Sequence, residues 1–136
     1  MIQRYTRKEM GDIWKDEYKF KTWLDVEIAA CEARAELGEI PFEDVKIIKE
    51  KANFDVNRVL EIEETTKHDV IAFLTNVAEY VGEPSRHIHY GMTSSDVLDT
   101  GLSLQMKKAG ELLLKSLMEL RDILKEQALK HKYTVC

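Results

Sequence analysis

The chain has 136 residues, of which 44% are hydrophobic and 33% charged, a balance typical of a globular domain with one hydrophobic core. Its net charge of −5 is spread over interspersed acidic and basic residues, which argues against a nucleic-acid partner. No apolar run is long enough to span a bilayer, and the N-terminus lacks the apolar segment of a signal peptide. We therefore expect a cytoplasmic protein with no membrane partner.

Long stretches rich in Leu, Ala, Glu and Lys, with only two prolines and six glycines, predict an all-α fold. Apolar residues at spacings of three and four mark the helices, and Gly38 and the Gly82-Glu83-Pro84 segment end two of them. Cys31 lies on an apolar helix face, where we expect a small buried hydrophobe. Neither Cys31 nor Cys136 belongs to a zinc or disulfide pattern. The first four predicted helices span residues 7–14, 16–37, 41–53 and 56–81.

The last predicted helix, residues 97–132, contains no proline and carries leucines at helical spacing along its length. A helix of about 36 residues is roughly 54 Å long, which exceeds the diameter of a domain of this size. Part of its apolar face therefore has no partner within the chain. We expect it to join a bundle with other copies, or with further chain.

The segment before this helix, residues 87–100, reads HIHYGMTSSDVLDT and is unusually polar. Thr93 and Asp96 have the spacing of a capping box, with Asp in place of the usual Glu or Gln. Capping does not explain three consecutive hydroxyls after a glycine, and a helix N-terminus also suits a carboxylate or phosphate. From these residues alone, capping and anion binding both remain open.

Histidines raise the question of a metal or an acid–base group. His87 and His89 would share one face of an extended strand, but no third ligand at suitable spacing completes a metal set, so we expect no metal. One of them could instead donate a proton near the hydroxyls. On a continuous helix His68 would lie one turn after Glu64, which favours a surface Glu–His pair.

Three segments resemble bacterial adenylosuccinate lyases, and they occur in the order of that family: R-Y-T-R-K-E-M at residues 4–10, K-H-D-V-I-A-F at 67–73 and H-Y-G-M-T-S-S-D-V-L-D-T at 89–100. The wider superfamily includes argininosuccinate lyase, fumarase, aspartase and carboxymuconate cycloisomerase. The resemblance implies a small N-terminal helical domain, residues 1–92, followed by the start of a central helical bundle, residues 93–136. It also implies a homotetramer whose bundle pools long helices from four subunits.

The activity implied by the resemblance is β-elimination of fumarate from adenylosuccinate, which gives AMP, and from the succinyl-carboxamide ribotide of purine synthesis. It needs no metal or organic cofactor. Carried over position by position, the resemblance gives two catalytic candidates, His68 and His89. The substrate-binding candidates are Arg4, Tyr5, Lys67, His68, Asp69, Thr93 and Ser94.

Two family segments are missing from the 136 residues. One contains G-R-T-H, whose histidine is the favoured general acid, and the other is a mobile loop, S-S-x-M-P-x-K-x-N, whose serine is the favoured base. We therefore expect an N-terminal portion of the enzyme that is inactive alone. The alternatives are another fumarate-releasing lyase of the superfamily and a non-catalytic helical interaction module.

Overall fold

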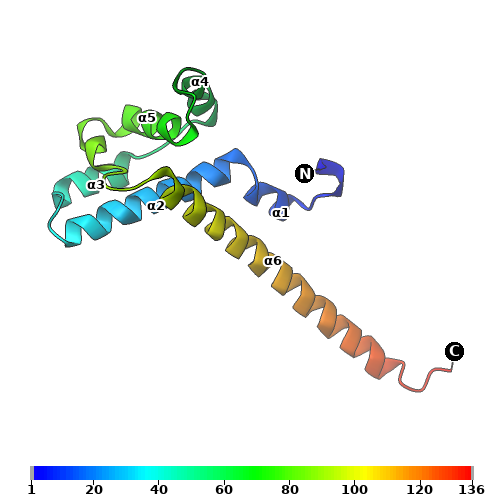
Figure 1. Ribbon diagram of the computed structural model, residues 1–136. Coiled ribbons are helices and arrows are strands. Elements are labelled where there is room, and N and C mark those ends of the chain that lie inside the picture. Colours follow the sequence, from blue (N-terminus) through cyan, green and yellow to red (C-terminus); the bar gives the residue numbers. More distant parts are fainter. Residues whose placement is uncertain (1, 136) are drawn as a thin grey trace.

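A computed structural model describes residues 2–135, and these residues form helices joined by short connections, with no strand among them (Figure 1). The all-α prediction is therefore confirmed. None of the described helices is long and apolar enough to cross a bilayer. In chain order the elements are η1 (Gln3–Tyr5), α1 (Lys8–Ile13), α2 (Asp16–Glu36), α3 (Phe42–Lys51), α4 (Val56–Thr66), α5 (Asp69–Val81), η2 (Glu83–His87) and α6 (Ser94–Lys130).

The hydrophobic core lies between α2, α3, α4 and α5, which gather at one end of the molecule (Figure 1). Its centre is aromatic: Phe20 of α2 stacks on Phe73 of α5 at 5.6 Å between ring centroids, and Trp23 meets both rings edge-on. Cys31 is 1% exposed, as the sequence predicted for a small buried hydrophobe. Aromatic pairs of this geometry stabilise a core beyond the area that they bury, so these three rings join α2 to α5.

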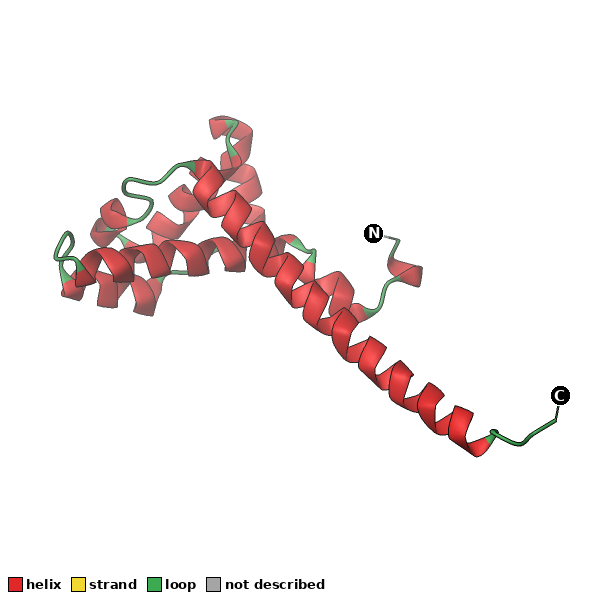
Figure 2. Ribbon diagram, turned by 60° about the horizontal axis from the view of Figure 1, so that its bottom comes forward, coloured by secondary structure: helices red, strands yellow, loops and turns green. Residues whose placement is uncertain are grey.

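Helix α6 packs on α2 with its first half only and projects beyond the rest of the molecule (Figure 2). Its buried positions recur every fourth residue over the first four turns: Val97, Gly101, Gln105 and Ala109. After Gly110 the large hydrophobic side chains of α6 are mostly exposed, as Leu113 and Leu117 show at 57% and 60%. The predicted helix with an uncovered face is therefore confirmed, although it begins at Ser94 rather than at Val97.

The prediction of one continuous helix over 56–81 is wrong. The chain breaks between α4 and α5 because Lys67 adopts a left-handed conformation (φ 51°) and ends α4, and His68 is extended and caps α5. The two helices pack against each other as an antiparallel pair, since Arg58 near the start of α4 donates to Glu79 near the end of α5. As a result, Glu64 and His68 do not occupy successive turns of one helix, and the predicted surface Glu–His pair is wrong as well.

Candidate functional site

The polar segment before α6 is a tight loop over residues 88–93 that lies against α2. His89 and Gly91 both have positive φ angles, 63° and 70°, and the Met92 amide donates to the His89 carbonyl at 3.3 Å. A methyl group on Gly91 would lie 2.5 Å from an Arg34 guanidinium nitrogen, which would have to shift, and the positive φ itself favours glycine there. Arg34, on α2, also stacks over the ring of Tyr90 at 5.0 Å.

The start of α6 has the predicted capping box. The Thr93 amide donates to Asp96 Oδ2 at 2.8 Å, and Thr93 occupies the cap position of the helix. No hydrogen bond joins the Ser94 or Ser95 hydroxyl to another of residues 2–135. Capping therefore uses Thr93 and Asp96 and leaves two hydroxyls, with the free amide groups of the first turn, able to receive an anion.

His68 has a defined orientation because it caps α5. Its Nδ1 accepts a hydrogen bond from the Ile71 amide at 3.3 Å, so in the neutral ring the hydrogen lies on Nε2. The ring is about half-exposed, and the neighbouring Asp69 carboxylate is 3.5 Å from Nδ1. Asp69 also accepts from the Val70 amide at 2.7 Å. The left-handed turn at Lys67 thus presents His68 and Asp69 together, with a donor at Nε2.

His87 and His89 bind different carboxylates on different helices. His87 Nε2 lies 2.9 Å from Asp44 Oδ2 of α3, whereas His89 Nδ1 lies 2.6 Å from Glu27 Oε1 of α2. They do not share one face, because His87 ends a 3-10 helix and His89 is in a left-handed turn. Residues 2–135 contain no group of three His, Cys, Asp or Glu side chains that could hold a metal ion.

Glu27 is a residue that sequence reasoning missed. It is 1% exposed, and both of its oxygens contact His89: Oε2 accepts from the backbone amide at 2.8 Å, and Oε1 lies 2.6 Å from ring Nδ1. Burial raises the pKa of the Glu27 carboxyl, and the hydrogen bonds and charge of His89 act against that rise. The available signal was an acidic residue three positions after Leu24 and four before Cys31, on the apolar face of its helix.

The other predicted residues lie elsewhere. Tyr5, next to Arg4, lines a groove of about 810 Å³ between the N-terminal segment and the middle of α6, where Leu112 and Ser116 contribute. From Ser94 to Leu112 is about 27 Å along the helix. No hydrogen bond joins His68 to His89, Thr93 or Ser94 among residues 2–135. A single chain therefore does not bring all the predicted residues together.

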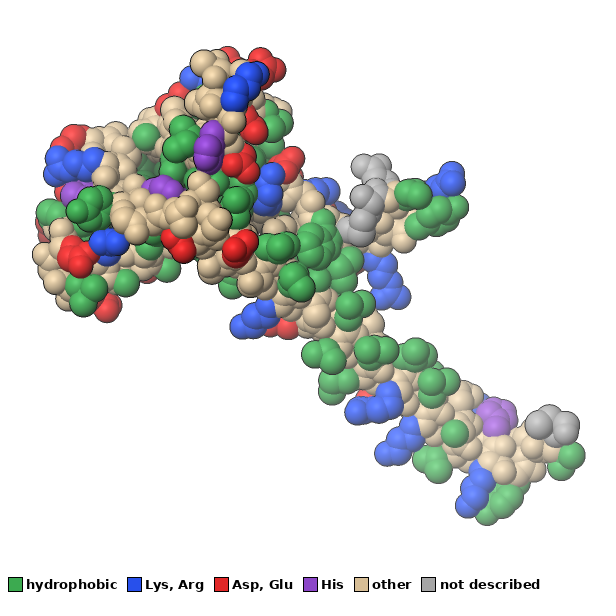
Figure 3. Space-filling model, in the orientation of Figure 1, with side chains coloured by type: hydrophobic (Ala, Val, Ile, Leu, Met, Phe, Trp, Pro, Cys, Tyr) green, Lys and Arg blue, Asp and Glu red, His purple; other side chains and the backbone are tan. Residues whose placement is uncertain are grey.

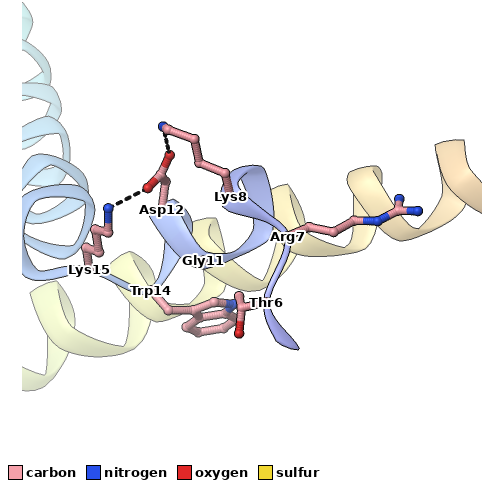
Figure 4. A pocket seen from close by; sticks show the side chains of 7 residues that line it. All are labelled: Thr6, Arg7, Lys8, Gly11, Asp12, Trp14 and Lys15. Atoms are coloured by element: carbon pink, nitrogen blue, oxygen red, sulfur yellow. Dashed lines mark hydrogen bonds and ion pairs between the residues drawn. The ribbon is translucent and has the colours of Figure 1, made fainter. Parts of the chain in front are cut away.

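A smaller cleft of about 370 Å³ lies beside α1 and contains none of the predicted site residues (Figure 4). Asp12 occupies one side of it, held by Lys8 and Lys15 at 2.6 Å each, while the Arg7 side chain points away toward α6. These lysines lower the pKa of Asp12, and its ionised carboxylate is already paired with their positive charges. We assign no chemistry to this cleft.

A sequence model of the family described as Lyase matches residues 3–136. The chain belongs to this lyase family. Among relatives, the adenylosuccinate lyase of Bacillus subtilis (strain 168) is 58% identical over 135 residues, and that of Synechocystis sp. (strain ATCC 27184 / PCC 6803 / Kazusa) is 61% identical. Each of these alignments covers 99% of this chain and 31% of the relative, so the chain spans less than a third of the curated relatives that it matches.

Solved structures agree with the lyase family assignment. The 3-carboxy-cis,cis-muconate lactonizing enzyme from Pseudomonas putida has a TM-score of 0.83 and 30% identity, over 93% of this chain and 30% of that chain. A fumarate lyase from Mesorhizobium sp. BNC1 has the same TM-score at 21% identity, covering 93% of this chain and 31% of that chain, which shows a likeness of fold alone. The arrangement of α1 to α6 is therefore shared with parts of these two enzymes.

Proposed function

We propose that this chain is the N-terminal portion of an adenylosuccinate lyase, an enzyme that releases fumarate from adenylosuccinate and from the succinyl-carboxamide ribotide of purine synthesis in the cytoplasm. The observation that carries the proposal is the identity of 58% and 61% to adenylosuccinate lyases over 99% of this chain. The muconate lactonizing enzyme, with the same fold, reaches only 30%. That difference favours the adenylosuccinate branch over another lyase of the superfamily.

In the proposed reaction, a base removes a proton from the carbon next to a succinyl carboxylate, and the electron pair expels the nitrogen leaving group, which an acid protonates. Thr93 and Ser94 hold a succinyl carboxylate at the start of α6, where free hydroxyl and amide donors converge. His68 and Asp69 contact the substrate beside the acid, with Lys67 next to them, and the His68 Nε2 hydrogen serves as a donor.

Arg4 and Tyr5 contact the nucleotide side of the substrate in this proposal, and His89 lines the same active site. The separation of Arg4 and Tyr5 from the start of α6 supports a site built from more than one subunit. The uncovered apolar face of α6 supports a homotetramer with a shared helical bundle (Figure 3). The 136 residues lack the G-R-T-H segment and the serine loop, so they supply binding groups without the acid or base.

A chimeric enzyme tests the proposal. The segment of the Bacillus subtilis adenylosuccinate lyase that aligns with this chain is replaced by residues 2–136, and fumarate release from adenylosuccinate is followed by ultraviolet absorbance. We expect an active chimera, and no release by the 136-residue chain alone. A soluble, tetrameric chimera that cannot cleave adenylosuccinate would contradict the proposal.

Two serines at the start of α6 provide a matched pair of variants in this chimera. Ser94→Ala removes a hydroxyl that donates to a charged carboxylate, which is worth about 1.5–3 kcal/mol, so kcat/KM should fall roughly 10- to 100-fold. Ser95→Ala removes a neighbouring hydroxyl that has no assigned role and should leave kcat/KM unchanged. Equal losses in both variants would show that the helix start, rather than the Ser94 hydroxyl, matters.

The exposed face of α6 also suits a non-catalytic helical interaction module. Mixing separates the two functions: the chain is unfolded and refolded together with the intact Bacillus subtilis enzyme, and the subunit composition is measured by native mass spectrometry. A lyase portion should enter or disturb the tetramer, whereas an unrelated module should leave it intact.

A further inference from the structure

Glu27 is a buried acid in the middle of α2, with 1% of its surface exposed and hydrophobic core residues on either side along the helix. An ionisable group in such a place needs full hydrogen bonding, because transfer of a carboxylate out of water is strongly unfavourable. Among residues 2–135, no lysine or arginine is buried beside it. Its position therefore calls for a specific partner.

That partner is His89, which lies 62 positions later in the chain and binds both oxygens of Glu27. One bond comes from the backbone amide at 2.8 Å and the other from ring Nδ1 at 2.6 Å. His89 is held in a left-handed conformation, φ 63°, which a residue with a side chain adopts only when its surroundings impose it. The two contacts with Glu27 stabilise His89 in this conformation.

The ring bond also fixes where the histidine hydrogen lies. An ionised carboxylate only accepts, so Nδ1 must carry a hydrogen, and in the neutral ring Nε2 is then left as a bare acceptor. Nε2 makes no hydrogen bond to the described residues. Every buried side-chain nitrogen or oxygen among those residues does have a hydrogen-bond partner, so Nε2 is not one of the buried atoms. Nε2 therefore reaches solvent, although only 17% of the ring side chain is exposed.

The turn that contains His89 leads directly to the start of α6. The His89 carbonyl accepts from the Met92 amide at 3.3 Å, and Thr93 follows directly as the helix cap. Fixing His89 on α2 therefore fixes the turn that delivers Thr93 and Ser94. The contact between Glu27 and His89 therefore lies in the turn that leads into α6.

We infer that Glu27 is a positioning residue of the lyase site: it holds His89 with hydrogen on Nδ1 and turns Nε2 toward the substrate as the working nitrogen. The catalytic part of this inference rests on the function proposed above. The tautomer part does not, because it concerns only the contact between two residues of this chain. The two parts can therefore be tested separately.

The tautomer is measured in the 136-residue chain, labelled with ¹⁵N at histidine, from long-range proton–nitrogen correlations of the ring. The His89→Gln variant assigns the signals. We expect a hydrogen on Nδ1 of His89 in the unaltered chain. A bare Nδ1 would overturn the inference whatever any variant does, since it would mean that Glu27 donates rather than accepts.

The Glu27→Gln variant should reverse the tautomer while keeping the shape of the contact. The amide oxygen can still accept from the His89 backbone, but the NH₂ group then donates to Nδ1, which must lose its hydrogen to Nε2. Glu36→Gln, on an exposed part of the same helix, is the matched control and should leave the His89 spectrum unchanged. A Glu27→Gln chain that is helical by circular dichroism and retains the original tautomer would contradict the inference.

The catalytic part is measured in the chimeric enzyme. Glu27→Gln should lower kcat/KM for adenylosuccinate about 10- to 100-fold, as loss of a carboxylate that orients a functional histidine does elsewhere, with the tetramer intact. Glu36→Gln should match the parent. If the unaltered chimera has no activity, the proposed function is refuted, and the tautomer measurement on the 136-residue chain remains valid. An active chimera that tolerates Glu27→Gln refutes the positioning role alone.

Discussion

Helix α6 packs closely against α2 at Gly101, and this contact makes a sharp test of the packing. A methyl group on Gly101 would lie 2.8 Å from Trp23 Cδ1 and 3.1 Å from Thr22 Oγ1. Both neighbours are buried, at 3% and 4% exposure, so neither can move aside freely. Gly110, nine residues later on the same helix, has nothing within 4 Å of the corresponding position.

The two glycines isolate the steric effect when each is changed to alanine. Alanine is favoured over glycine inside a helix by up to about 1 kcal/mol, and this gain applies to both positions. Only Gly101→Ala adds the overpacking penalty, about 1–3 kcal/mol for one inserted carbon in a filled core. We therefore expect Gly110→Ala to stabilise the chain slightly. Gly101→Ala should be neutral to about 2 kcal/mol destabilising.

The free energy of unfolding is measured by urea titration with tryptophan fluorescence, at low and matched protein concentrations so that association through α6 does not contribute. The difference between the variants, about 1–3 kcal/mol, is the quantity of interest because the propensity term cancels. If both substitutions shift the unfolding midpoint equally and in the same direction, the close packing of α6 on Trp23 is wrong.

Three further predictions follow from single side chains. His68→Ala should destabilise the chain by about 1 kcal/mol in urea unfolding, whereas His68→Asn should not, because Asn is also a good helix cap. Burial raises the pKa of Cys31 to about 11, so iodoacetamide should label Cys31 far more slowly in the native chain than in denaturant, as read by peptide mass spectrometry. Arg58 lowers the pKa of Glu79, so the ionised Glu79 carboxylate stabilises the folded chain. This stabilisation is present above the carboxyl pKa of the unfolded chain and is lost as the pH falls through the lower pKa of the folded chain. The difference in unfolding free energy between the parent and Glu79→Gln should therefore shrink in acid.

Helical periodicity predicted most of the fold because the long helices bury one face. In α2 and in the first half of α6, apolar side chains recur every three or four residues, and the buried positions follow that spacing. The break between α4 and α5 was missed because Thr66 and Lys67 carry no glycine or proline signal. The left-handed conformation of Lys67 accompanies the packing of α4 against α5. Such packing is a tertiary contact, and local sequence propensity does not predict it.

The candidate site could be predicted only where its geometry is local. The capping box joins Thr93 to Asp96 within one turn, and its spacing in the sequence was sufficient. The contact between Glu27 and His89 joins residues that are far apart in the chain, so no short motif contains it. The only local sign was an acid on an apolar helix face, which is also compatible with a position at the edge of the core.

The distances along α6 bear on how the proposed enzyme builds its site. The N-terminal segment is tied to this helix through α1, where the Gln105 amide donates to the Ile13 carbonyl at 2.7 Å, and through Arg7, which reaches Ser116. Tyr5 therefore lines a groove with Leu112, which is about 27 Å along the helix from Ser94. A continuous helix without proline does not bend enough to close such a gap. If the Tyr5 and Ser94 positions both contact one substrate in the proposed enzyme, this separation favours contributions from different copies of the chain. The uncovered face of α6 is the surface through which we propose that the copies associate.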